Sequence, residues 1–292
     1  MTAESITEQP DAQQQLRAHL HGMWAGVAGA WAEHAGFVDE RSTALTARML
    51  ELTAPQPGER VLELACGPGG LGLEAARRVA LGGEVVLSDV AAEMTAIAAA
   101  RASALGLENV RTRELDLEAI DEPDAAYDVV LCREGLMFAT DPARAAGEIG
   151  RVLRPGGRVA VAVWGPRERN PWLGSVLDAV GAQLGAPMPP PGIPGPFALS
   201  DAAALGGYLS GAGLSGVTVD ELPVPLHTVS FEDWWARTSA LAGPLAKILV
   251  NLAPEAVEAI RARLREAVAP YQNEDGGLDF PGVTLLASAR RD

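Results

Sequence analysis

Apolar positions are spaced in different ways along the chain, and the spacing changes near residue 60 and again near residue 165. Residues 11–37 carry apolar side chains at steps of three and four, which predicts a helix, and a second helix is expected from about 39 to 52. Further along, short apolar runs alternate with helical patterns. We expect strands at 61–65, 84–88, 110–114, 128–132 and 158–164, with helices at about 71–79, 91–105 and 142–153. Asp141 is the expected N-cap of the last of these helices, followed by Pro142 at its first position. This β-α-β-α alternation indicates an α/β fold with a mainly parallel sheet covered on both faces.

The alternation stops after residue 164, and helices and loops dominate the rest of the chain. Helices are expected near 172–184, at 201–211 behind Ser200 as N-cap, from the S-x-x-D capping signature at Ser230, and at 253–268. Strands are expected at about 216–224 and 283–289, whereas the proline-rich stretch 186–196 can only be a loop. We therefore predict an N-terminal helical cap, residues 1–54, and an α/β domain, residues 55–292, with insertions at about 165–213 and 225–280.

Composition and charge exclude several classes of protein. The 292 residues carry a net charge of −15, and the basic residues are scattered, so no nucleic acid and no anionic membrane is expected as a partner. No apolar run approaches the roughly 18 residues of a membrane span, and the polar N-terminus does not resemble a secretory signal. A cytoplasmic protein, monomer or homodimer, is the expectation. The two cysteines, Cys66 and Cys132, and the four histidines are not spaced like the ligands of a metal ion, so we expect no metal. We also expect no disulfide, as is usual in a reducing compartment.

Residues 60–72, R-V-L-E-L-A-C-G-P-G-G-L-G, form a predicted strand, a glycine-rich turn and the start of a helix. The turn fits G-x-G-x-x-G, and Asp89 lies 22 residues after Gly67, as in dinucleotide-binding proteins, so an NAD-dependent oxidoreductase is one alternative. Glu63 argues against it, because a carboxylate at the end of the strand repels a pyrophosphate and favours a ligand with a cationic amino-acid head. Asp116, just past the third strand, can accept a hydrogen bond from an adenine amino group.

The segment V-L-E-L-A-C-G-P-G resembles motif I of the class I S-adenosylmethionine-dependent methyltransferases. Residues 127–158 are similar to the segment after strand four in bacterial small-molecule enzymes related to the ubiquinone/menaquinone C-methyltransferases (type 11-like). The resemblance implies a Rossmann-like sheet of order 3-2-1-4-5-7-6 with strand 7 antiparallel, a place that suits the strand at 283–289. It also implies S-adenosylmethionine as cofactor, S-adenosylhomocysteine as its product, and a small-molecule substrate.

The resemblance further assigns expected roles to single residues. The cofactor's methionine end is expected against the turn, its ribose hydroxyls at Asp89, and its adenine at Asp116 and Leu117. Val90 and Met94 would pack on the nucleoside, while backbone carbonyls at the end of the fourth strand would meet the ammonium group. The complete set is Glu63, Ala65, Gly67, Pro68, Gly69, Asp89, Val90, Met94, Asp116, Leu117, Cys132 and Arg133. Because Ala65 replaces the usual first glycine of the motif, we expect an ordinary L-residue backbone there.

Fewer signals point to catalysis and substrate binding. Glu134 follows the fourth strand, beside the expected position of the transferred methyl group, and could accept a proton or pair with a cationic amine. His34, with His21 and His227, is a candidate general base. Residues outside the sheet are expected to form an apolar or aromatic substrate pocket: Trp24, Trp31, Met137, Trp172, Trp234 and Trp235. The expected reaction is in-line methyl transfer to an oxygen, nitrogen or carbon atom of a small molecule, and a non-catalytic S-adenosylmethionine-binding protein is the second alternative.

Overall fold

The computed structural model describes residues 12–292, so that residues 1–11 of the predicted cap lie outside the described residues. Within the described part, the cap consists of α1 (Ala12–Glu33), α2 (Ala35–Arg41) and α3 (Thr43–Thr53), rather than the two predicted helices. The helical path is interrupted at His34 and at Ser42. The second interruption lets α3 lay the fully buried side chains of Leu45 and Met49 against the sheet.

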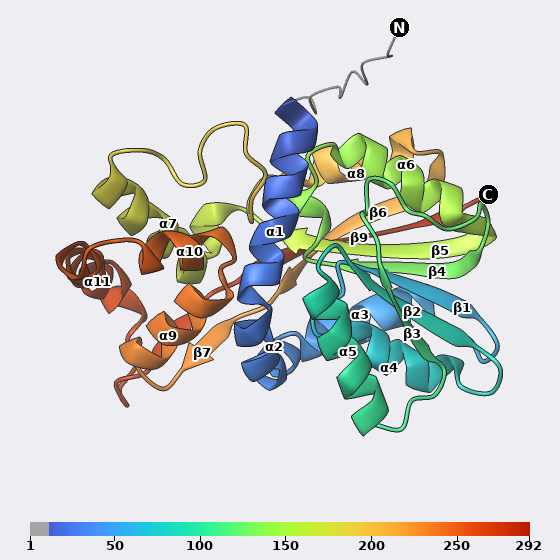
Figure 1. Ribbon diagram of the computed structural model, residues 1–292, viewed down its shortest axis with the longest axis horizontal. Helices are drawn as coiled ribbons and strands as arrows, with labels where there is room; N and C mark the ends of the chain where they lie inside the picture. Colours follow the sequence, from blue (N-terminus) through green and yellow to red (C-terminus); the bar gives the residue numbers. More distant parts are fainter. Residues whose placement is uncertain (1–11) are drawn as a thin grey trace, which may run out of the picture.

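A seven-stranded sheet lies at the centre of residues 12–292 (Figure 1). The strands are β1 (Arg60–Leu64), β2 (Glu84–Asp89), β3 (Val110–Glu114), β4 (Tyr127–Arg133), β5 (Leu153–Trp164), β6 (Leu214–Pro223) and β9 (Val283–Arg291). Their order is β3-β2-β1-β4-β5-β9-β6, and β9 runs antiparallel to both of its neighbours. The α/β class, the strand order and the antiparallel terminal strand are confirmed.

The central strands are apolar because helices cover both faces of the sheet. Val61, Val85, Val129 and Val161 are fully buried. Figure 1 shows α3 below the sheet together with α4 (Gly70–Val79) and α5 (Ala92–Ala104), and α6 (Pro142–Val152) and α8 (Ala202–Gly211) above it. The central strands are thus buried, whereas the edge strands β3 and β6 are partly exposed.

Two of the three predicted N-cap residues cap their helices in the structure, and the third does not. Asp141 accepts a hydrogen bond from the backbone N–H of Arg144 at 3.0 Å, and Ser230 accepts one from Asp233 at 3.1 Å. Ser200 does not cap α8. Asp201 does so instead, since its carboxylate accepts from the backbone N–H of Ala204 at 2.7 Å and starts the helix one residue later.

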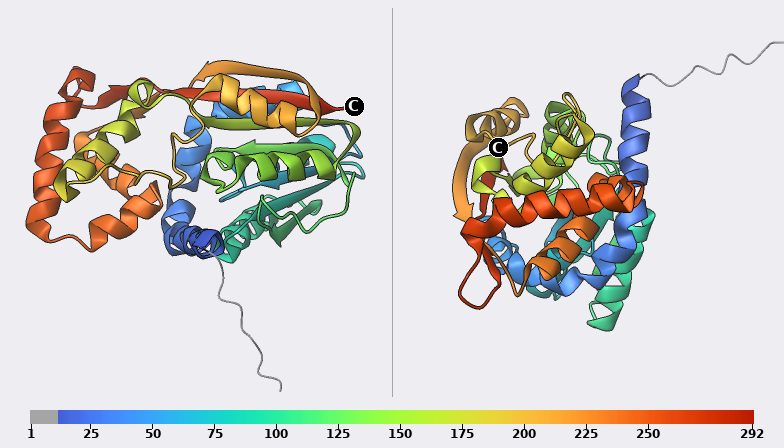
Figure 2. Two further views of the ribbon diagram at one scale, coloured as in Figure 1. Left: turned by 90° about the horizontal axis from the view of Figure 1, so that it is seen from above. Right: turned by 90° about the vertical axis from the view of Figure 1, so that its left-hand side faces the viewer.

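A second group of helices lies beyond the carboxyl ends of the parallel strands, and α1 runs along one side of the molecule where this group meets the sheet (Figures 1 and 2). It contains α7 (Pro171–Leu184), α9 (Phe231–Leu241), α10 (Pro244–Val250) and α11 (Pro254–Val268), with β7 (Leu226–Thr228) paired to β8 (Leu278–Phe280). We did not predict α10, which has seven residues, or β7 and β8, which have three residues each. Such short segments are too short to show a clear hydrophobic period. None of the helices in residues 12–292 is long and apolar enough to cross a bilayer.

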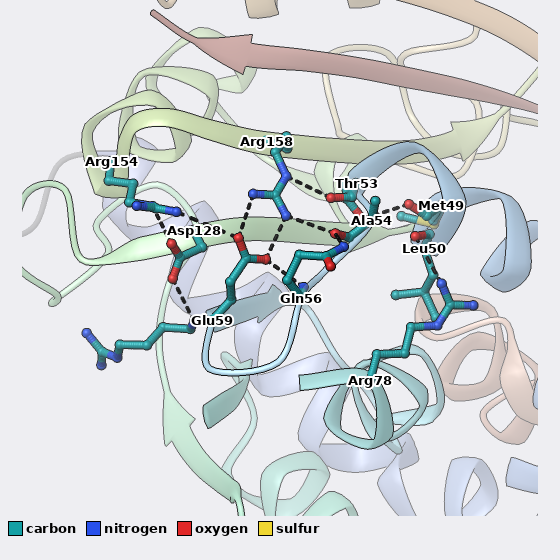
Figure 3. Close-up of polar contacts among 11 residues, drawn as sticks. Met49, Leu50, Thr53, Ala54, Gln56, Glu59, Arg78, Asp128, Arg154 and Arg158 are labelled. Atoms are coloured by element: carbon teal, nitrogen blue, oxygen red, sulfur yellow. Dashed lines mark hydrogen bonds and ion pairs between the residues drawn. The ribbon is translucent and has the colours of Figure 1, made fainter. Parts of the chain in front are cut away.

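The amino ends of the strands are tied to the cap by a polar network (Figure 3). Arg158 on β5 donates to both carboxylate oxygens of Glu59, at 2.8 and 2.6 Å, and to the backbone carbonyl of Thr53 at 2.7 Å. Asp128 accepts from the backbone N–H of Arg60 at 2.7 Å, and Arg78 donates to the carbonyl of Leu50. This network fixes α3 at the end of the sheet opposite the strand ends that line the cavities described next.

Candidate active site

The turn after β1 adopts a backbone conformation that favours glycine. Ala65, Gly67 and Gly69 have φ of 51°, 52° and 85°. The ordinary L-residue backbone that we expected at Ala65 is therefore wrong, and alanine takes the left-handed conformation at a cost of about 1 kcal/mol. The turn is held by Asp89 at the end of β2, whose carboxylate accepts from the backbone N–H groups of Gly67 at 2.9 Å and Ala91 at 3.1 Å.

Gly135, after β4, packs directly on this turn. A Cβ atom at Gly135 would lie 2.4 Å from the Cβ of Ala65 and 3.1 Å from the Sγ of Cys132. Its φ of −108° suits alanine, so a substitution is opposed by contact and not by backbone strain.

Gly135→Ala is expected to lower the free energy of unfolding by about 2–4 kcal/mol, because the turn must shift to admit the methyl group. Denaturant unfolding measures this loss. Gly147→Ala is the matched control, since nothing lies within 4 Å of a Cβ atom at this position in α6, and alanine is the better helix former by about 1 kcal/mol. Equal stability of Gly135→Ala and the wild type would contradict the close approach.

Carboxylates gather around the turn, in what we call the acidic cleft. Its lining contains the side chains of Glu63, Asp89, Asp116, Glu118 and Glu134 against two arginines, Arg17 and Arg133, with His21 beside them. Five carboxylates against two guanidinium groups make the lining acidic. Val90, Met94 and Leu117 supply apolar wall. Within the described residues, no three of these or other His, Cys, Asp or Glu side chains are placed so that they could hold one metal ion.

Glu63 is buried at the end of β1, and its carboxylate accepts from the backbone N–H of Gly72 at 2.8 Å in the first turn of α4. Burial raises the pKa of the Glu63 carboxyl to about 8, against the opposing effects of Arg133 and the Gly72 N–H. Burial also raises the pKa of Asp89. The cleft thus gains from a positively charged ligand, which would favour the ionised carboxylates.

The raised pKa of Glu63 predicts how the ligand-free protein responds to pH. In the folded state Glu63 keeps its proton up to about pH 8, whereas the ordinary carboxyl value is 4.5, so the unfolded state binds fewer protons between these values. The free energy of unfolding is therefore expected to fall as pH rises from 5 to 8, by roughly 2–4 kcal/mol.

Glu63→Gln is expected to flatten this decline, leaving only the part that Asp89 and Glu134 contribute. Denaturant unfolding at pH 5, 6.5 and 8 measures it, with the exposed Glu255→Gln in α11 as control. A decline in Glu63→Gln as steep as that of the wild type would refute the assignment.

Helix α1 closes over the acidic cleft. Arg17 forms an ion pair with Asp116, and the Nε2 atom of His21 lies 3.6 Å from the same carboxylate. Further along α1, Val27 and Ala28 pack on Ala91 and Met94 at the start of α5. The cleft has a volume of about 100 Å³, below the roughly 300–1,000 Å³ of most ligand pockets.

A second, larger cavity of about 730 Å³, which we call the apolar cavity, lies between α1, α2, α7, α9 and α10. The predicted pocket residues Trp24, Trp31, Met137, Trp172 and Trp234 all line it. Trp235 does not line it. Adjacent residues on a helix point about 100° apart, so α9 directs Trp234 to the cavity and leaves Trp235 buried in the core near Arg261.

Glu134 stands in the wall between the acidic cleft and the apolar cavity and lines both. Its backbone is left-handed, with φ of 60°. The Oε1 atom is buried and has no hydrogen-bond partner among the described residues. Burial raises the pKa of the Glu134 carboxyl, while Arg133 and Arg41 oppose the shift. An unpartnered carboxylate with a raised pKa is suited to hold or accept a proton from a ligand.

Ala65, Gly67 and Pro68 also line the acidic cleft. The predicted residues described next lie outside the cavity walls. His34 begins α2 and lines neither cavity within the described chain. His227 is exposed on β7 and contacts Asp279, with 2.7 Å between Nδ1 and Oδ1. Gly69 is the N-cap of α4, and Cys132 is buried behind Arg133, so both support the acidic cleft from outside its lining.

Trp164 and Arg41 are among the wall residues of the apolar cavity that escaped prediction. Trp164 ends β5, and Arg41 ends α2. Both line the apolar cavity, where the Arg41 guanidinium lies against the indoles of Trp164 and Trp172. No motif surrounds Arg41, and only the packing of α2 beside β5 and α7 reveals it. The position of Trp164 at a strand end was the one available signal.

The sequence of this chain matches a family model and several known proteins, and the named matches are methyltransferases. A methyltransferase-domain family matches residues 61–157. The demethylmenaquinone methyltransferase of Thermus thermophilus is 36% identical over 176 residues, covering 55% of this chain and 79% of that protein. An uncharacterized protein of Mycobacterium tuberculosis is 34% identical over 158 residues, and the match spans only 54% of its length.

Solved structures share the fold. The YcgJ protein from Bacillus subtilis superposes with a TM-score of 0.57 at 21% identity, over 84% of this chain and 97% of that chain. A phosphoethanolamine N-methyltransferase of Haemonchus contortus, in complex with S-adenosylhomocysteine, gives 0.54 at 17% identity, over 85% and 53%. At these identities the likeness concerns the fold alone. The identity to the Thermus relative, the match to the methyltransferase-domain family and the strand order agree. The chain therefore belongs to the class I S-adenosylmethionine-dependent methyltransferases.

Proposed function

We propose that the protein transfers the methyl group of S-adenosylmethionine to a small apolar or aromatic molecule held in the apolar cavity. The observation that carries this proposal is the shared wall between the two cavities. Leu20, Trp24, Trp31 and Phe138, together with Glu134, line both of them. A cofactor in the acidic cleft and an acceptor in the apolar cavity would therefore meet at Glu134.

The acidic cleft suits this cofactor better than a dinucleotide. Its five carboxyl groups outnumber its two guanidinium groups, and a cationic ligand would favour the ionised form of the buried carboxyls, whereas a pyrophosphate would oppose it. Both oxygens of Asp89 already accept a backbone N–H, and each keeps a lone pair for a ribose hydroxyl. Asp116 would take the adenine edge once α1 moves outward and Arg17 releases it.

When bound, the sulfonium supplies an already activated methyl group. The chain's own residues then hold the acceptor in line, exclude water and manage one proton. The aromatic walls exclude water from the apolar cavity, and the unpartnered Oε1 of Glu134 receives the proton of a hydroxyl acceptor. If the nucleophilic atom of the acceptor carries no proton, the protein needs only to hold the acceptor in line with the methyl group.

Methyl transfer from labelled S-adenosylmethionine to a panel of phenols, amines and quinone precursors tests the proposal. Transfer to at least one class of acceptor is the expected result, and the class identifies oxygen, nitrogen or carbon as the methylated atom. Binding of S-adenosylhomocysteine without transfer to any acceptor would favour the non-catalytic alternative. Separate calorimetric titrations with S-adenosylhomocysteine and NAD test the oxidoreductase alternative on the same preparation.

A further inference from the structure

Arg41 is held in a corner of the apolar cavity by two indole rings. Its Cζ atom lies 3.8 Å from the ring centroid of Trp172 and 4.8 Å from that of Trp164. The two rings meet edge to face, with centroids 5.1 Å apart and planes at 68°. Cation–π contact with these rings fixes the position of the guanidinium and engages its flat face.

The edge of the same guanidinium is free. The Nε and Nη2 atoms are buried and have no hydrogen-bond partner among the described residues. Leaving a buried donor unsatisfied costs about 1–3 kcal/mol, and the neighbouring walls of the cavity, Trp164, Trp172 and Leu173, are apolar. Burial lowers the pKa of Arg41 to about 10, so that the group stays charged at neutral pH. The two donors together form one side of the guanidinium fork, which matches the two oxygens of a carboxylate.

The charges around the apolar cavity favour an anion as well. Arg41, Arg237 and Lys247 line the cavity against a single carboxylate, Glu134, although the whole chain carries a net charge of −15. Arg237 already pairs with Asp233 at 2.8 Å, and Lys247 is exposed on α10. The described residues show no ion pair between Arg41 and Glu134. Arg41 is thus the cation of this wall whose buried donors, Nε and Nη2, remain open to a ligand.

We propose that the apolar cavity recognises ring compounds that carry a carboxylate, and that Arg41 binds the carboxylate through Nε and Nη2. This proposal rests on the proposed function for the identity of the ligand as methyl acceptor. One buried cation suits a monoanion, because a phosphate dianion would leave charge uncompensated against apolar walls. Arg41 is then a specificity-determining residue, and Glu134 meets the other end of the acceptor.

Binding of matched probes to the full chain, saturated with S-adenosylhomocysteine, tests the proposal by calorimetry. The probes are 2-naphthoate and the neutral 2-naphthamide, which differ in charge and little in shape. The wild type is expected to bind the carboxylate at least tenfold more tightly than the amide. Arg41→Met, which keeps an unbranched stem against the indoles, is expected to bring the two affinities to within about twofold.

Two further variants separate fold from recognition. Arg41→Lys keeps the charge and loses the planar fork, so a preference between those of the wild type and Arg41→Met is expected. Arg263→Met is the control, because Arg263 contacts Gln183 on the surface and lines neither cavity. Should Arg41→Met fail to fold, the wild-type preference and the Arg41→Lys variant still decide the question.

The outcomes distinguish this proposal from the proposed function. If S-adenosylhomocysteine binds but the wild type does not prefer the carboxylate, the carboxylate site is refuted and the methyltransferase proposal stands. If the preference persists unchanged in Arg41→Met, a cation other than Arg41 binds the carboxylate and the assignment is wrong. If S-adenosylhomocysteine itself does not bind, the proposed function fails, and the carboxylate preference is then read from the ligand-free protein.

Discussion

Asp89→Ala is expected to weaken the binding of S-adenosylhomocysteine by roughly a hundredfold. Two effects combine. The variant loses the charged acceptor for the ribose hydroxyls, and it releases the glycine turn, because Asp89 accepts from the backbone N–H of Gly67 at 2.9 Å. Hydrogen bonds to charged groups contribute about 1.5–3 kcal/mol each, so losing one or two of them gives this magnitude. Calorimetric titration of the variant and the wild type measures the change.

Two companion variants divide the effect. Asp89→Asn keeps one acceptor oxygen and is expected to fall between the wild type and Asp89→Ala. Asp201→Ala removes a carboxylate of similar local geometry, since Asp201 accepts from the backbone N–H of Ala204 at 2.7 Å but lines neither cavity. It is expected to lose about 1 kcal/mol of stability and no cofactor affinity. Near-normal affinity in Asp89→Ala would overturn the assignment of the cofactor site.

The sheet was predictable because its signals are local. Val61, Val129 and Val161 lie in short apolar runs of the kind that a covered sheet buries, and Asp141 followed by proline marks a helix start from two adjacent residues. The spacing of Gly67 and Asp89 matches the contact that joins the glycine turn to the end of β2. Each of these features needs only a short segment of sequence to be recognised.

The apolar cavity was only partly predictable because its walls come from distant segments. Tryptophans outside the sheet indicated a pocket, but nothing in the sequence shows that Arg41 of the cap meets Trp164 of β5 and Trp172 of α7. The predicted backbone conformation of Ala65 was wrong for another reason. Its left-handed backbone is imposed by a turn that Asp89 and Gly135 hold from two sides, and this tertiary constraint outweighs the local preference of alanine.

Glu134→Gln is expected to lower kcat/KM for a hydroxyl acceptor by roughly a hundredfold to ten-thousandfold, the usual contribution of a positioned general base. The amide keeps the size of the side chain and cannot accept the proton. Affinity for S-adenosylhomocysteine is expected to change by less than about threefold. Because burial raises the pKa of the Glu134 carboxyl, wild-type activity should rise with pH through a midpoint above the ordinary value of 4.5, and this limb should vanish in the variant.

The strained backbone at Glu134 provides a second, independent readout. A non-glycine residue at φ of 60° costs about 1 kcal/mol and persists where the surrounding structure or the function requires its side chain. Glu134→Gly is therefore expected to unfold at slightly higher denaturant concentration while losing activity, whereas Glu255→Gln on the surface changes neither. Unchanged turnover and unchanged acceptor affinity in Glu134→Gln, for every acceptor that the wild type methylates, would remove Glu134 from the mechanism. A gain in stability of Glu134→Gly without loss of activity would reduce the residue to a strained turn.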